Sequence, residues 1–139
     1  MKEFSTSSRS MQELPFQEPP YIFWAEIAKI YDGDTFYCWA DLGFHVRRYL
    51  KIRMDSINTA EIRGSERPEG LEDLDYVKQF MAVGDKVVIQ SKKDKSTKTG
   101  GFDRWAAHVW VDTGADGEEQ WLHLNHHLID VEIAEYTPH

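Results

Sequence analysis

Carboxylates and arginines gather in three short segments of the chain, and together they could hold a metal ion and a phosphodiester. Residues 53–61 read R-M-D-S-I-N-T-A-E, residues 32–35 read D-G-D-T, and a further arginine stands at position 104. Hard divalent cations such as Ca²⁺ prefer oxygen ligands, and the guanidinium fork matches a phosphate. A phosphodiester resists attack because its negative charge repels a nucleophile, so these residue types are typical of a site that hydrolyses one.

Each of these segments also has an ordinary structural explanation. D-G-D-T is most often just an acidic turn, and arginines on strands are most often outward-facing or paired with surface acids. Glu61 in a polar loop is usually a solvated carboxylate. The order in which the three segments occur together is what favours a site.

The elements that must position these residues are mostly strands. β-type runs occupy residues 22–31, 35–40 and 44–54, with a turn at 41–43, and further strands are expected at 86–90 and 104–111. A polar loop is expected between the last two strands, at 91–101. Apolar residues recur at helical spacing between 71 and 81, and Gly84 ends this helix. Asn125 is a candidate N-cap for a short helix that ends near Ala134.

Three strands, a helix, two strands and a terminal helix are the order expected of a five-stranded Greek-key barrel of the oligonucleotide-binding (OB) class. We therefore expect an α+β, mainly β fold with two or three helices. Residues 1–20 are rich in Ser, Glu, Gln and Pro and are expected to form a disordered or loosely attached leader. Residues 21–139 are expected to form a single domain.

From about Trp24 to Ala134 the sequence resembles the staphylococcal nuclease (thermonuclease) domain family. D-G-D-T at 32–35 matches the first acidic motif of that family. The family's R-x-x-x-x-D-T-P-E motif is met by Arg53 followed by N-T-A-E at 58–61, and its Y-G-R motif by F-D-R at 102–104. The resemblance implies a nuclease-like OB barrel and a metal-dependent endonuclease, or phosphodiesterase, that hydrolyses DNA or RNA.

The resemblance also implies a role for each motif residue. The cofactor would be a divalent metal, Ca²⁺ above all, with oxygen ligands from Asp34, Asn58 and the backbone carbonyl of Thr59. Glu61 would position or deprotonate the attacking water, and Asp32 would support the site from behind. The phosphate would be bound, and its growing charge stabilised, by Arg53 and Arg104.

The chain departs from the family pattern at positions that matter for metal binding. Asn58 replaces a carboxylate, so the site keeps an oxygen ligand and loses one negative charge, which lowers the expected calcium affinity. Ala60 replaces the motif proline, which loosens the turn before Glu61. These departures favour an alternative function, in which the domain is a catalytically weakened nuclease-like module that binds nucleic acid or a protein partner.

The charge distribution bears on the nucleic acid partner. A net charge of -8 argues against a general nucleic-acid binder, yet residues 47–53 hold four basic residues and no acid. A lysine-rich loop follows at 92–98, from which Lys92, Lys93 and Lys95 are candidate substrate-binding residues, and Tyr136 is a candidate base-stacking residue.

Histidines 123, 126 and 127 beside Asn125 spell an alternative signal, typical of a zinc site or of a His-Asn-His nuclease. Their ordinary explanation is as surface or helix-capping residues.

Cellular location follows from what the sequence lacks. No apolar run is long enough to span a membrane and no signal peptide is evident, so we expect a cytoplasmic monomer with no membrane partner. The single cysteine, Cys38, is expected to be a small buried hydrophobe in a reducing compartment.

Overall fold

The computed structural model describes residues 13, 15, 17, 19–99, 102–114 and 117–137, with the backbone alone described at 93–99 and 102–103. The leader predicted for residues 1–20 therefore lies mostly outside the described residues.

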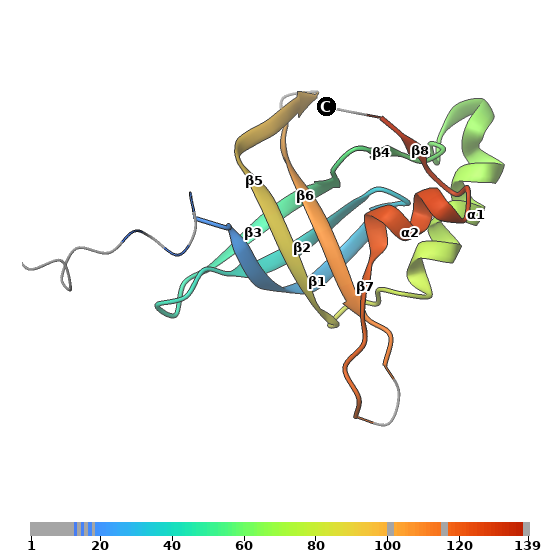
Figure 1. Ribbon diagram of the computed structural model, residues 1–139. Coiled ribbons are helices and arrows are strands. Elements are labelled where there is room, and N and C mark those ends of the chain that lie inside the picture. Colours follow the sequence, from blue (N-terminus) through green and yellow to red (C-terminus); the bar gives the residue numbers. More distant parts are fainter. Residues whose placement is uncertain are drawn as a thin grey trace, which may run out of the picture.

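Strands make up most of the described chain, and two α-helices and one 3₁₀ turn accompany them (Figure 1). The strands are β1 (Ile22–Asp32), β2 (Thr35–Asp41), β3 (Arg47–Met54), β4 (Ile57–Asn58), β5 (Lys86–Thr99), β6 (Phe102–Asp112), β7 (Trp121–His123) and β8 (Glu135–Tyr136). The helices are η1 (Gly64–Glu66), α1 (Arg67–Lys78) and α2 (Leu124–Asp130).

Five of the strands close into a barrel. The main sheet has the order β3-β2-β1-β5-β6-β7, and a further pairing of β3 with β6 closes the barrel, so that β7 is an additional strand paired with β6. That closing pair is parallel, with Arg53 opposite Ala106, whereas the other pairings in the sheet are antiparallel. The described chain is thus mainly β with a closed five-stranded barrel and two α-helices, which confirms the predicted architecture at this level and is compatible with an OB-like barrel.

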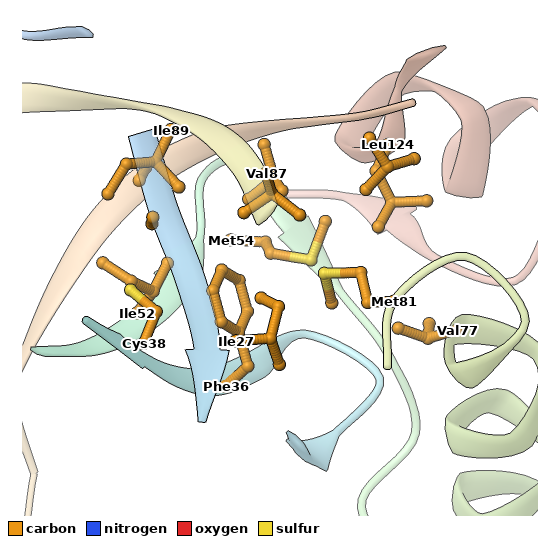
Figure 2. Packing of buried hydrophobic residues seen from close by; sticks show 14 of the residues in the cluster. Ile27, Phe36, Cys38, Ile52, Met54, Val77, Met81, Val87, Ile89 and Leu124 are labelled. Atoms are coloured by element: carbon orange, nitrogen blue, oxygen red, sulfur yellow. The ribbon is translucent and has the colours of Figure 1, made fainter. Parts of the chain in front are cut away.

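Alternate residues of the barrel strands point inward and form the core (Figure 2). Phe36, Ile27 and Met54 lie at its centre, and Val77 and Met81 come from α1 and the segment after it to cover one end. The prediction that Cys38 is a buried hydrophobe is confirmed, since it is fully buried and burial raises the pKa of its thiol to about 12.

Helix α1 begins at Arg67, four residues before the helical spacing of apolar residues that the sequence shows from position 71. Pro68 stands in its first turn, where a missing N–H costs nothing, and its buried side includes Leu74 and Val77. The helix ends at Lys78, so the apolar spacing that suggested helix as far as Met81 continues into a turn.

Several local predictions were wrong. The strand expected from residue 44 begins at Arg47, because Phe44 and His45 adopt positive φ in a turn. The polar loop expected at 91–101 is instead an extension of β5 as far as Thr99. Asn125 is not an N-cap: His123 holds that position, and α2 ends at Asp130 rather than near Ala134.

Among the described residues, no helix has the length and apolar character needed to cross a membrane.

Candidate functional site

Asp34 forms the centre of the candidate site, in the tight turn between β1 and β2. Its side chain is almost fully buried, and both carboxylate oxygens accept hydrogen bonds. Oδ1 accepts one from the hydroxyl of Thr35 at 3.0 Å, and Oδ2 accepts one from the backbone N–H of Thr59 at 3.0 Å. The carbonyl of Asp34 accepts from the N–H of Met54 at 2.8 Å. The acidic turn is therefore joined to the end of β3 and to the segment after β4.

Arg53 bridges two of the predicted metal ligands. Its Nη1 lies 3.0 Å from Oδ2 of Asp34, and its Nη2 donates to Oδ1 of Asn58 at 3.1 Å. Nη1 also donates to the carbonyl of Ile57 at 2.8 Å. The guanidinium is mostly buried and is held by four protein oxygens, of which the fourth is the carbonyl of Met54 at 3.4 Å. The positively charged guanidinium of Arg53 thus lies between Asp34 and Asn58.

Asp32 adds a second carboxyl group to the same turn. Its Oδ1 accepts a hydrogen bond from the backbone N–H of Asp34 at 3.1 Å, which fits a supporting role. Burial, with the hydrogen bond and negative charge of Asp34, raises the pKa of Asp32 to about 7. The two adjacent acids therefore do not both carry a full charge at neutral pH.

The segment that carries Thr59, Ala60 and Glu61 is fastened from the side of helix α1. The backbone N–H of Ala60 donates to Oδ2 of Asp73 at 3.2 Å, and burial raises the pKa of Asp73. Gly70 of α1 packs so closely that an added Cβ would overlap the carbonyl of Glu61. Helix α1 thus supports the turn that contains Ala60, the position at which the family motif has a proline.

Glu61 itself faces solvent. Its backbone N–H donates to the carboxylate of Glu66 at 3.2 Å, and its side chain is exposed. The structure therefore places Glu61 two residues beyond the Asp34 cluster, with a side chain free of the core.

Thr59 is packed against the acidic turn through its side chain. Its hydroxyl oxygen is buried without a hydrogen-bond partner, and a Cβ on Gly33 would lie 2.8 Å from it. Only glycine at position 33 leaves room for this close approach. The backbone of Gly33 in the D-G-D-T segment thus packs closely against the side chain of Thr59 in the N-T-A-E segment.

Arg104 is half-buried on β6, beside the closing seam of the barrel. Ala106 is opposite Arg53 in the parallel β3–β6 pairing, and side chains two residues apart on a strand share a face. Arg104 therefore projects from the same outer face of the barrel as Arg53. The fold brings the two arginines, about fifty residues apart in sequence, to adjacent strands.

A two-stranded pairing that the sequence did not reveal brings a further carboxylate to the site. β4 pairs antiparallel with β8, with Asn58 opposite Glu135 and Ile57 opposite Tyr136. Directly opposed side chains in such a pair have Cβ atoms about 5 Å apart. Glu135 thus stands beside the position where the motif carboxylate is missing. Tyr136, the predicted stacking residue, is exposed next to it.

The chain was compared with models of protein families and with curated proteins. No family model matches the chain, and no curated protein matches it. The likeness to the nuclease domain therefore rests on the sequence motifs alone.

The donor atoms suit a hard cation in kind. Asp34, Asp32, the amide oxygen of Asn58 and the carbonyl of Thr59 offer only oxygen, which Ca²⁺ prefers. Among the described residues, no group of three or more His, Cys, Asp or Glu side chains could hold a metal ion. A metal here would thus depend on amide and backbone oxygens, and Arg53 would have to give up its contacts with Asp34 and Asn58.

The lysine candidates are placed only in part. Lys92 lies on β5, and its Nζ is 2.8 Å from Oδ2 of the fully buried Asp55. Asp55 begins the turn that follows β3, so Lys92 lies against the start of the segment that leads to Asn58. The side chains of Lys93 and Lys95 lie outside the described residues.

The histidines considered as a zinc or His-Asn-His group each have contacts with other side chains. His123 and His108 lie 3.0 Å apart, between Nε2 and Nδ1, and His108 is also 3.4 Å from Asp55. His126 faces Asp130, and His127 contacts the hydroxyl of Tyr76 at 2.8 Å. Burial lowers the pKa of both His108 and His123.

Asn125 acts as a clamp rather than as a helix cap. Its Oδ1 accepts from the N–H of Val109 at 2.9 Å, and its Nδ2 donates to the carbonyls of Asp55 and Ala107 at 3.0 and 3.2 Å. The side chain is buried and joins α2, β6 and the turn after β3. No sequence pattern signals this role, because it depends on contacts between distant segments.

Proposed function

We propose that this chain is a metal-dependent phosphodiesterase acting on DNA or RNA, of the staphylococcal nuclease type. The observation that carries the proposal is the convergence of D-G-D-T and N-T-A-E on one buried carboxylate, Asp34, with Arg53 bound to both segments. These contacts bring together the residues to which the motifs assign metal binding and phosphate binding.

The residues would divide the chemistry as follows. Asp34, Asn58 and the Thr59 carbonyl would hold a Ca²⁺ ion, which when bound supplies positive charge to the phosphate. Arg53 would move from Asp34 to the phosphate, since a guanidinium binds either carboxylate or phosphate through its fork. Arg104, on the same outer face, would bind the same group. Glu61 faces solvent, where water can reach its carboxylate, and would take the proton from the attacking water.

Digestion of a labelled oligonucleotide tests the proposal. We expect cleavage with millimolar Ca²⁺ and none with chelator, and a rate loss of roughly 100-fold or more for Glu61→Gln and for Arg104→Ala. Glu69→Gln, an exposed acid in the first turn of α1, is a matched control that should keep full activity. Cleavage that survives chelation, or that both site variants retain, would contradict the proposal.

A second function is favoured by one specific observation. Arg53 already occupies the place between Asp34 and Asn58, so the site is electrostatically satisfied without a metal. In this case the domain would be a nuclease-like module that binds nucleic acid or a protein partner without cleaving. Calorimetry separates the two: absence of heat with millimolar Ca²⁺, together with salt-sensitive oligonucleotide binding, supports the module.

A further inference from the structure

A ladder of aromatic rings and cations covers the outer face of β1, β2 and β3, on the side of these strands that is away from the core. We call it the aromatic ladder, and its members alternate with core residues along the strands. Its rings are Tyr31, Tyr37, Trp39 and Tyr49, and its cations are Lys29, Arg47 and Lys51. The register sets Tyr37 opposite Lys51 and Trp39 opposite Tyr49.

The rings form a continuous and partly exposed surface. Tyr37 and Tyr49 stack with centroids 5.7 Å apart and planes 13° apart, and Trp39 lies 5.0 Å from Tyr49. Trp39 is 40% exposed and Tyr49 46% exposed. Neighbouring aromatic residues with this much open area indicate a binding surface rather than isolated surface side chains.

Cations lie over these rings. Nζ of Lys51 is 5.5 Å from the centroids of both Tyr31 and Tyr37, and the guanidinium of Arg47 is 5.4 Å from Trp39. Such contacts hold the positive groups at the level of the rings. Two acids share this surface: Glu26 lies 3.6 Å from Arg47, with both side chains about half exposed, and Asp41 is opposite Arg47 in the pairing of β2 with β3.

A hollow extends the ladder at one end. It has a volume of about 480 Å³ and lies between two exposed tryptophans, Trp24 and Trp39. Two cations, Arg47 and Lys86, and two acids, Glu26 and Asp41, also line it. An aromatic-walled hollow of this size, with cations beside it, can take a flat heterocycle.

The other end of the ladder leads to the Asp34 cluster. Tyr49, Lys51 and Arg53 are alternate residues of β3 and so project from one face, and Thr35 opposite Arg53 continues the row on β2. A polymer that lies along this face reaches Arg53 without leaving the sheet.

We infer that the aromatic ladder binds single-stranded nucleic acid, with bases stacked on Trp39 and Tyr49 and phosphates against Arg47 and Lys51. Rings interleaved with cations suit a strand whose bases are unstacked, since every base offers a π-face and every linkage a negative charge. A duplex hides its bases, and an apolar protein surface leaves the cations without partners. The inference deepens the proposed function by naming its substrate class, and rests on that function only for delivery of the strand to Arg53.

Fluorescence anisotropy in chelator tests this binding apart from any cleavage. The probe is a labelled mixed-sequence 12-nucleotide strand, as DNA and as RNA, titrated with the full chain. We expect saturable binding, with a logarithm of the association constant that falls with the logarithm of the salt concentration with a slope of about −1.4, for the two phosphate contacts of Arg47 and Lys51 at roughly 0.7 each. A duplex of the same sequence should bind more weakly, and polyglutamate should not compete.

Paired variants separate stacking and charge from folding. Trp39→Leu should raise the Kd about tenfold, while Trp39→Phe, which keeps a ring, should stay within about threefold of the parent. Lys51→Gln should reduce the salt slope by about 0.7, and Lys78→Gln, an exposed lysine of α1, should leave it unchanged. Unfolding curves of all variants check that each is folded.

Three results would overturn the inference: no binding of either strand at 50 mM salt, preference for the duplex, or equal competition by polyglutamate. Equal affinities of the parent, folded Trp39→Leu and folded Lys51→Gln would also overturn it. Binding that follows the expected pattern while cleavage assays stay negative would support the ladder and count against hydrolysis, so the two proposals fail separately.

Discussion

Replacement of Asn125 by alanine should cost a large part of the stability of the domain. The side chain is buried and forms three hydrogen bonds, and its loss would remove the acceptor of the Val109 N–H and a donor to the Asp55 carbonyl. The carbonyl of Ala107 would keep a partner, because it also accepts from the N–H of Asp55 at 2.8 Å. Loss of the partner of a buried polar group costs about 1–3 kcal/mol, so two such losses predict a destabilisation of about 2–6 kcal/mol.

Urea unfolding followed by tryptophan fluorescence measures this loss. The midpoint should fall while the dependence on urea concentration stays the same, because the surface exposed on unfolding changes little. His126→Ala, an exposed position in the same helix, is the matched control and should stay within about 0.5 kcal/mol of the parent.

An isosteric variant sharpens the test. Asn125→Asp keeps an oxygen for the N–H of Val109 but turns a second oxygen toward the carbonyls of Asp55 and Ala107. The introduced carboxyl should therefore have a raised pKa, and its destabilisation should shrink as the pH falls. The clamp assignment would be refuted by an alanine variant that loses less than about 1 kcal/mol, or by an aspartate variant as stable as the parent at pH 7.

Further predictions concern the site and its surroundings. Asn58→Asp should tighten Ca²⁺ binding on the order of tenfold by adding a ligand charge, and an unchanged affinity in calorimetry would remove Asn58 from the site. Gly70→Ala should lower stability in urea by about 1–3 kcal/mol, because its methyl group meets the Glu61 carbonyl; a neutral result would show that this approach is loose. Burial lowers the pKa of His108 and His123 on folding, helped for His123 by the charges of nearby histidines, so the unfolded chain binds more protons below about pH 6.5 and stability should fall as the pH falls through that value. His123→Gln should reduce this pH-dependent loss, measured as the difference in unfolding free energy between pH 7.5 and 5.5; an identical loss in both proteins would contradict the burial argument.

The sequence predicted those parts of the fold that depend on local pattern. β1 and β2 were found at nearly their observed bounds, because alternation of apolar and polar residues is a property of each strand alone. The helical spacing of apolar residues from position 71 likewise indicated α1, which begins four residues earlier, at Arg67. The extension of β5 was missed, since its lysine-rich sequence is polar throughout and gains its structure from pairing with β6.

The candidate site divided in the same way. The motif residues around Asp34 and Arg53 could be named from spacing alone, and the structure brings these two together. Glu135 could not be found, because it reaches Asn58 through a pairing of two-residue strands that leaves no periodic signal. The clamp formed by Asn125 was also hidden, since a buried amide and a helix cap look alike in sequence.

The parallel seam between β3 and β6 has a consequence for how the protein matures. Arg53 and Arg104 become neighbours only when that seam forms, and the seam joins segments about fifty residues apart, a contact of the slow, non-local kind. A chain whose barrel is still open cannot present both arginines to one phosphate. Under the proposed function, binding of one phosphate by both arginines therefore requires a completed barrel.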